Sequence, residues 1–563
     1  MPHRRRLARS ALLTLTLLSA CAAADPAKPG QDPAPVTPGA SGAFLQGQFA
    51  IESADPAQAA DAFLRALAAD PANLELRQQA FLASVMAGRP EAAALAQGLP
   101  DSPAALLVLA GQDIGAGRWA AAESKFDQLP GQGGNQVLRP LLSAWARQGA
   151  GRTDDAIAAL RPFVESGQYR GLFALHAALI EDLAGRQADA GRDYGIAQVD
   201  SGGLNLRLGT MLASWQARTG HETEARRIIQ AMVESAPNLA IAEPALQLDA
   251  SHVQVGNAAD GVAEAYLALA ATLQRQNASE FSLLLLHLGL QLRPQFTAAR
   301  LLMSDLQLDA RQFRQASATL AEVPASDSLI AVVRLRQANI MEQQGRKDDA
   351  ARILEETAAA YPQRPEPLAM LAEMQRVATQ FTQAAATYGR AIDRIPNPGP
   401  NDWVMFYQQG TAYERAHQWP QAEADFLRAL QLSPDQPAVL NYLGYSWAEQ
   451  GRNLPRARQM LERAVELRPN DGAIVDSLGW VMLREGDTAG AARWLERAVE
   501  LEPEDWSINA HLGDAYWDAG RHAEAQTQWR RALILHPEPE DAEKLRAKLA
   551  GNVPPTTVQR SAP

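Results

Sequence analysis

Residues 506–537 read WSINAHLGDAYWDAGRHAEAQTQWRRALILHP, and this stretch decides the fold of the 563-residue chain. Counted from Trp506, positions 4, 7 and 11 form one helical stripe, and positions 20, 24 and 27 form a facing stripe on a second helix. Small residues at Gly513 and Ala525 allow the two helices to approach closely. Pro537 cannot continue the second helix, so the chain turns and starts again. The stretch therefore predicts two antiparallel helices.

The same unit recurs before residue 506. Gly410, Gly444, Gly479 and Gly513 are spaced 34, 35 and 34 residues apart, and prolines follow the same period. Hydrophobic residues make up 47% of the chain and aromatic residues only 6%, a composition that favours packed helices. Alternating β-branched runs typical of strands are scarce. The sequence thus predicts an all-α solenoid of about 14 helix-turn-helix units.

Weaker copies of the unit extend towards the N-terminus. Ala59, Phe63 and Pro71 stand at the positions of the second helix, with Gly47 at the close contact of the first. Glycines that connect the two helices of a unit recur at Gly88, Gly117, Gly151, Gly185, Gly220 and Gly345. The copies are most degenerate between residues 72 and 135 and most regular after residue 403.

The period breaks between Asn238 and Gly261, around Pro244 and a polar stretch. We therefore predict a degenerate N-terminal solenoid at 43–250, an irregular joint at 251–262 and a C-terminal solenoid at 263–550. The best-formed repeats are expected at 403–537, and residues 551–563 are expected to be a disordered tail.

The repeat resembles the tetratricopeptide repeat (TPR), whose spacing is matched by Asn509, Leu512, Gly513, Tyr516, Ala525, Trp529, Ala532 and Pro537. This resemblance implies a superhelical solenoid in which the first helix of each unit lines a concave groove. Positions 2, 5, 9 and 12 of that helix would then point into the groove. In the best-formed block we assign a partner-binding groove to Tyr407, Asn441, Tyr445, Asp476, Trp480, Asp514 and Trp517.

Two interpretations of these groove residues stay open. Large aromatic side chains at helical spacing can simply pack in the core. Exposed aromatic side chains beside hydrogen-bonding groups are also typical anchors of protein interfaces. The resemblance implies partners that are proteins or peptides.

The N-terminus predicts export. Basic residues from Arg4 to Arg9 precede an apolar stretch and the tetrapeptide Leu18-Ser19-Ala20-Cys21, which resembles the lipobox of bacterial lipoproteins. Cys21 is the only cysteine of the chain, so we predict a signal peptide at 1–20, acylation of Cys21 and a Pro/Ala-rich tether at 21–42. Ala22 follows Cys21, and resemblance to enterobacterial lipoproteins then implies the inner leaflet of the outer membrane, facing the periplasm.

Composition and motifs argue against other functions. The net charge of −12 is unfavourable for nucleic-acid binding, and histidines are scattered without a metal-ligand or catalytic spacing. We expect no enzyme, no cofactor and no metal. The mature chain resembles TPR lipoproteins of Gram-negative bacteria, some of which act as adaptors for a periplasmic carboxyl-terminal-processing protease. The sequence therefore predicts a membrane-anchored scaffold; the alternative is an assembly factor for secretion, pilus or exopolysaccharide machinery.

Overall fold

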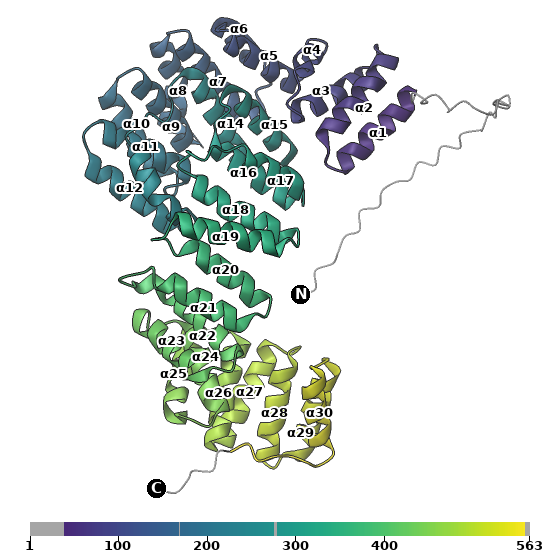
Figure 1. The fold of residues 1–563 in the computed structure, drawn as a ribbon, viewed down its shortest axis with the longest axis vertical. Helices are drawn as coiled ribbons and strands as arrows, with labels where there is room; N and C mark the ends of the chain where they lie inside the picture. The colour runs from purple at the N-terminus through teal and green to yellow at the C-terminus, as the bar shows by residue number, and fades with distance from the viewer. Residues whose placement is uncertain (1–38, 168, 275–278, 558–563) are drawn as a thin grey trace, which may run out of the picture. The chain divides into compact units, whose positions relative to one another are not determined.

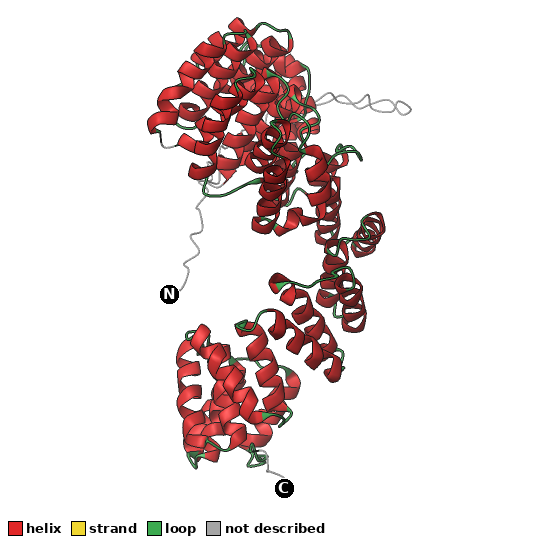
Figure 2. Cartoon of the chain, turned by 90° about the vertical axis from the view of Figure 1, so that its left-hand side faces the viewer, coloured by secondary structure: helices red, strands yellow, loops and turns green. Residues whose placement is uncertain are grey.

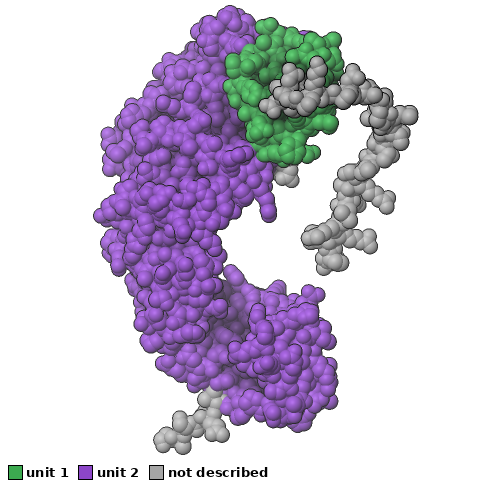
Figure 3. All heavy atoms as spheres, turned by 45° about the vertical axis from the view of Figure 1, so that its right-hand side comes forward, with its two compact units in different colours: residues 1–98 green, residues 99–563 purple. Residues whose placement is uncertain are grey.

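The computed structural model describes residues 39–167, 169–274 and 279–557, and all regular structure in these residues is helical (Figure 2). The chain divides into two compact units at residues 98 and 99 (Figure 3). The predicted signal peptide, Cys21 and nearly all of the tether lie outside the described residues. Within the described part of the chain, no helix combines the length and the apolar character needed to cross a membrane.

The described residues of unit 1, 39–98, form four helices: α1 (Ala40–Glu52), α2 (Pro56–Ala69), α3 (Leu74–Met86) and α4 (Glu91–Ala96). Asp55 caps α2, because its carboxylate accepts a 3.0 Å hydrogen bond from the backbone N–H of Gln58. Gly47 lies directly on the Phe63 ring, as the repeat pattern predicts. Helix α1 begins three residues before the predicted start of the solenoid.

Unit 2 contains the remaining helices (Figure 1). Its first part comprises α5 (Pro103–Gly115), α6 (Trp119–Asp127), α7 (Asn135–Gly149), α8 (Thr153–Ser166), α9 (Arg170–Leu183), α10 (Gln187–Asp200), α11 (Leu206–Arg218) and α12 (Glu222–Ser235). Its middle comprises the 3-10 helix η1 (Pro237–Ala242), α13 (Glu243–Asp249), α14 (Ala258–Gln274), α15 (Ser279–Leu292), α16 (Thr297–Asp309), α17 (Phe313–Ala321), α18 (Ile330–Gln343), α19 (Lys347–Ala360), α20 (Glu366–Val377) and α21 (Phe381–Ile392).

The last part of unit 2 comprises the 3-10 helix η2 (Pro400–Asp402), α22 (Trp403–Arg415), α23 (Trp419–Leu432), α24 (Pro437–Glu449), α25 (Leu454–Leu467), α26 (Gly472–Glu485), α27 (Thr488–Leu501), α28 (Trp506–Asp518), α29 (His522–Ile534) and α30 (Pro539–Leu549). Apart from α13 and α30, the α-helices of both units pack as fourteen consecutive pairs, from α1 with α2 to α28 with α29. The predicted all-α repeat solenoid is confirmed.

The small residues of the repeat sit where the two helices of a pair meet. A Cβ atom on Gly479 would lie 2.6 Å from Leu495 Cγ, and one on Gly513 would lie 2.4 Å from the Trp529 ring. The connecting residue is left-handed, with φ of 76° at Gly151 and 92° at Gly486, a backbone conformation that favours glycine. In four of the described repeats this residue is not glycine: it is Ala54, Arg311, Thr379 or His417.

The predicted irregular joint at 251–262 falls between α13, which ends at Asp249, and α14, which begins at Ala258, so residues 251–257 are irregular. Helix α14 packs against α7 and α9, far back in the chain, and α15 packs against α5. Residues 99–563 form one compact unit that includes the joint.

The predicted disordered tail needs correction over its first residues. Val553 packs against the apolar core of the last repeats, and Thr556 is only 9% exposed. A Cβ atom on Gly486 would lie 3.4 Å from Thr557 Cγ2, so the tail reaches the end of α26. Residues 558–563 lie outside the described residues.

Candidate functional site

The seven predicted groove residues lie on the first helices of four successive repeats, α22, α24, α26 and α28. Helix α26 contacts both α24 and α28 directly, so the structure does bring most of these side chains together. Asp476, Trp480 and Asp514 are buried at 5%, 7% and 5% exposure, whereas the other four are half-buried. The inner face of this block is therefore packed over its last repeats and partly open over its first ones.

His511, which the sequence analysis did not single out, holds this face together. Its Nδ1 lies 2.9 Å from an Asp476 carboxylate oxygen, and its ring stacks on Trp480 with centroids 4.2 Å apart. The indole N–H of Trp480 donates to the carboxylate of Glu449. Three consecutive inner helices, α24, α26 and α28, are thus linked by side chains.

The electrostatics of this cluster favour a charged histidine. Burial by itself would lower the pKa of His511, but the adjacent carboxylate of Asp476 reverses this effect. The net pKa of His511 is raised above the ordinary value of 6.5. The imidazolium and Asp476 therefore form a buried ion pair, which fixes α28 on α26.

Asp514 and Trp517 are engaged with the end of the chain. The Asp514 carboxylate accepts hydrogen bonds from the Trp529 indole at 2.9 Å and from the Lys548 ammonium at 2.7 Å. Trp517 lies with its ring 5.4 Å from that of Trp529 and 4.2 Å from that of His522. These two predicted groove residues join α28 to α29 and α30.

The open part of the face surrounds Asn441. The Oδ1 atom of Asn441 is buried and has no hydrogen-bond partner among the described residues. Tyr445 on the same helix is half-buried, with its ring 6.4 Å from that of His511. Tyr407 packs beside Phe426 and Tyr442, with ring centroids about 6 Å apart. Partner binding by the seven residues stays a prediction, and these three are the ones the packing leaves accessible.

In the first part of unit 2 the corresponding inner face is covered by helix α14 of the same chain. Gly261 of α14 lies on the Trp145 ring, where a Cβ atom would come within 2.3 Å. Glu264, only 3% exposed, forms ion pairs with Arg207 of α11 and, at 2.9 Å, with Arg293. No periodic signal in the sequence could have revealed this fold-back, because the partners lie far outside one repeat.

A cleft of about 720 Å³ remains beside α14. Leu172, Leu175 and Leu302 line it together with alanines of α14, and Arg207 and Glu264 lie at its wall. His176 also lines the cleft, and complete burial lowers its pKa to about 3, so it is neutral and accepts a 2.9 Å hydrogen bond from Trp145. Over the described residues, no group of three or more His, Cys, Asp or Glu side chains could hold a metal ion.

Comparison with known proteins identifies the repeats. Residues 301–365, 407–472, 452–505 and 482–549 match tetratricopeptide-repeat families. No curated protein matches the sequence significantly.

The solved structures that match the chain include YrrB, the Cut9–Hcn1 complex and yeast Tom70. YrrB, described as a TPR protein with an unusual peptide-binding site, is 19% identical over 34% of this chain and 97% of its own, with a TM-score of 0.29. The Cut9–Hcn1 hetero-tetramer of APC/C gives 15% identity over 91% and 96%, with a TM-score of 0.36. Yeast Tom70 gives 13% identity over 80% and 95%, with a TM-score of 0.32. The matched residues are thus similar to tetratricopeptide repeats, which form scaffolds for protein–protein interaction.

Proposed function

We propose that this protein is a lipid-anchored scaffold of the bacterial cell envelope that binds partner proteins, as an adaptor for a periplasmic protease or a cell-wall enzyme. The TPR repeats support the scaffold role, since this fold is typically non-enzymatic. The lipobox ending at the only cysteine, Cys21, supports the anchor. Acylation with several chains gives stable attachment to a membrane.

The observation that carries the binding site is that Asn441 and Tyr445 lie half-buried on one helix of the inner face. The Oδ1 atom of Asn441 is buried without a donor, which is unfavourable, and rotation of the side chain would let it accept from a backbone N–H of a bound peptide. Burial, together with Glu449, raises the pKa of Tyr445 above its ordinary value, so its hydroxyl stays neutral and can donate. An acceptor and a donor on one helix suit the backbone of an extended peptide.

The test is capture of partners from envelope extract with the acylated full chain, followed by calorimetry with the recovered protein. Asn441→Ala and Tyr445→Ala should each weaken binding by about 1–2 kcal/mol, the range of interface hot spots, while melting changes little. Ile534→Ala on α29, where the side chain is 72% exposed, is the matched control and should bind normally. Full binding by both variants would exclude this face.

Trp480→Ala separates packing from binding. Because Trp480 is buried against His511, its removal should lower the melting temperature first. The alternative function, an assembly factor for an envelope complex, predicts that secretion, pilus or polysaccharide components are recovered in place of a protease. Identification of the captured proteins by mass spectrometry decides between the two.

The anchor is tested separately. Cys21→Ala should abolish lipid labelling and move the protein from the membrane to the soluble periplasmic fraction. Unchanged partition with membranes would show that the anchor lies elsewhere.

A further inference from the structure

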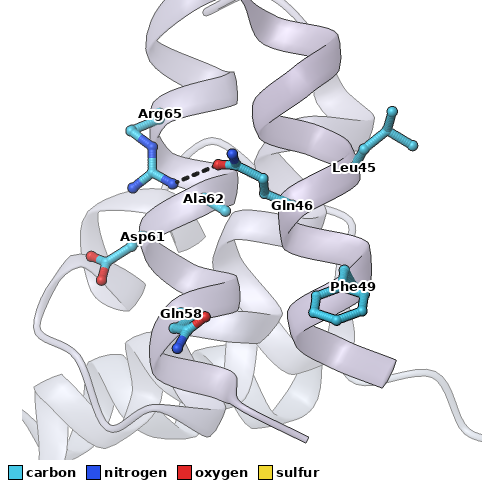
Figure 4. A pocket seen from close by; sticks show the side chains of 7 residues that line it. All are labelled: Leu45, Gln46, Phe49, Gln58, Asp61, Ala62 and Arg65. Carbon is cyan, nitrogen blue, oxygen red and sulfur yellow. Dashed lines mark hydrogen bonds between the residues drawn. The ribbon is translucent and has the colours of Figure 1, made fainter. Parts of the chain in front are cut away.

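Helix α1 carries two large apolar side chains that face solvent. Leu45 is 67% exposed and Phe49 is 70% exposed, and they lie four residues apart on one side of the helix. Figure 4 shows both side chains on α1. Beside them, Arg65 of α2 donates a 3.1 Å hydrogen bond to the side chain of Gln46 on α1. Single exposed apolar residues are common on protein surfaces. Whether the exposure of these two is unusual is therefore judged from the equivalent positions in the other repeats.

The repeat register gives the position of Phe49. It lies five residues before Ala54, whose φ of 54° marks the left-handed connection to the second helix. The residues at the same distance from the connection in later repeats include Ala146, Ile180, Ile340, Ala412, Val481 and Ala515, and each of these is 0% exposed. Where this position is fully exposed in a later repeat, at Gln112, the residue is polar.

The later positions are buried because the second helix of the preceding repeat covers them. Helices α25 and α27, for example, pack directly on α26 and α28. In the described residues, which begin at 39, no helix precedes α1. Arrays of this kind need a polar outer face on their terminal repeats to remain soluble, and α1 presents Leu45 and Phe49 instead.

The chain just before α1 is unsuited to covering this face. Residues 22–38 contain five prolines, and their only large apolar side chain is that of Val36. The face itself also has a distinctive charge pattern: residues 40–51 include no charged side chain. On the neighbouring helix, Asp61 is paired with Arg89 at 2.6 Å, and Arg65 adds a positive charge beside Gln46.

We propose that the face formed by Leu45 and Phe49 docks on the surface of the lipid bilayer that holds the acylated Cys21. This inference rests on the anchor in the proposed function. At no more than about 3.6 Å per residue, α1 cannot begin farther than roughly 70 Å from Cys21. The anchor keeps α1 at a high effective concentration beside the bilayer, so two apolar side chains are enough to contribute to membrane binding. They would be too few for a stable interface with another protein. An uncharged helix face suits the boundary between headgroups and acyl chains.

The experiment uses the acylated full chain with a polarity-sensitive fluorophore on Gln58→Cys, which lies beside Phe49 on α2 (Figure 4). The thiol of Cys21 is consumed by acylation, so the new cysteine is the only free thiol. The protein is placed on vesicles of phosphatidylethanolamine and phosphatidylglycerol whose acyl chains carry bromine. The matched control carries the label on Val199→Cys, at a side chain that is 79% exposed.

We expect bromine to quench the label at residue 58 several-fold more than the label at residue 199. The double substitution Leu45→Ser and Phe49→Ser should abolish this difference while the protein still floats with the vesicles. Its helical spectrum and melting should be unchanged, because both side chains are mostly exposed. Added salt should reduce the quenching only slightly, since Leu45 and Phe49 carry no charge and Arg65 alone adds an attraction to anionic headgroups that salt screens.

Equal quenching at both sites in a protein that floats would overturn the docking proposal and leave acylation of Cys21 standing. A chain that never floats contradicts acylation, and the docking proposal fails with it. A dimer in solution that the double substitution abolishes would assign the face to a second copy of the chain and also overturn the proposal.

Discussion

Two tryptophan–histidine pairs stand at identical repeat positions in unit 2, yet the pKa values of their histidines are shifted in opposite directions. Trp145 and His176 are 31 residues apart in the first part of the unit, and Trp480 and His511 are 31 residues apart in the last. Burial lowers the pKa of His176, which accepts a hydrogen bond from its tryptophan. The carboxylate of Asp476 raises the pKa of His511, which stacks on its tryptophan and pairs with Asp476 when protonated.

The neighbours explain the difference. Aligned on the left-handed residues Gly151 and Gly486, Asp476 corresponds to Leu141. Aligned on Gly117 and Gly451 in the preceding repeats, Glu449 corresponds to Gly115. The carboxylates beside His511 therefore have no counterpart at these two positions beside His176. The apolar pair is covered by α14, which returns from far along the chain, whereas the charged pair is covered by α28 of the next repeat. The inner face of a repeat is thus covered either by a helix from far along the chain, as by α14, or by a helix of the next repeat, as by α28.

Glu264→Ala should disrupt the packing of α14 on the earlier helices of unit 2. Loss of this buried carboxylate leaves Arg207 and Arg293 without their shared partner, and breaking such a buried pair costs about 3–5 kcal/mol. We expect peptides of α7, α9, α11 and α14 to lose protection together in hydrogen exchange followed by mass spectrometry. Glu222→Ala, which removes an exposed pair with Arg226, should change stability by less than about 0.5 kcal/mol. Loss of protection confined to α14 would show that the fold-back does not support the earlier repeats.

Gly479→Leu tests the packing between neighbouring helices in the last part of unit 2. A side chain here would meet Leu495 at the closest contact of α26 and α27, and overpacking of this kind costs about 1–3 kcal/mol. The expected loss of protection is centred on α26–α29 and spares α5–α9. Gly195→Leu on α10 adds the same side chain where nothing lies within 4 Å, and its melting temperature should stay close to that of the unmodified protein.

The two histidines predict opposite responses to pH. The folded state protonates His176 only near pH 3 and the unfolded state near pH 6.5, so this residue reduces stability progressively as the pH falls between these values. The slope approaches about 1.4 kcal/mol per pH unit. His511 has a raised pKa, so its contribution is complete below pH 6.5 and is lost as the pH rises through the folded-state pKa. Hydrogen exchange as a function of pH, read separately in α7–α9 and α26–α28, measures both.

Asp476→Leu sharpens this prediction by giving His511 the surroundings of His176. Burial should then determine the pKa of His511 and lower it, so α26–α28 should now lose protection on acidification. An unchanged alkaline response would assign the raised pKa to Glu449 or Asp514.

The smallest effect is expected at the connections, which the two regions share. Gly185 and Gly520 have φ values of 76° and 77°, and alanine at either position should cost about 1 kcal/mol from backbone strain. Equal changes in urea midpoint for Gly185→Ala and Gly520→Ala would show that the first and last parts of unit 2 have equivalent connections. The two parts would then differ only in how their inner faces are covered. A markedly larger effect at one site would show that the connections also differ.

The sequence predicted contacts that fall within one repeat. Gly479 and Leu495 are 16 residues apart in a pattern that recurs, so their approach follows from helix geometry. The fold-back of α14 could not be predicted, because Gly261 follows Trp145 by 116 residues and neither belongs to a periodic pair. The seven predicted groove residues lie on the first helices of their repeats, but periodicity alone could not show that His511 and Lys548 engage Asp476 and Asp514.

The fold-back sets an order in which the protein can be completed during synthesis. A chain made from its N-terminus presents Trp145 and Leu141 long before Gly261, so the first repeats of unit 2 wait with an uncovered apolar surface. The repeats after α16 cover their surfaces as each neighbour is made. Any chaperone that protects the growing chain is therefore needed mainly for the interval between the synthesis of α7 and that of α14.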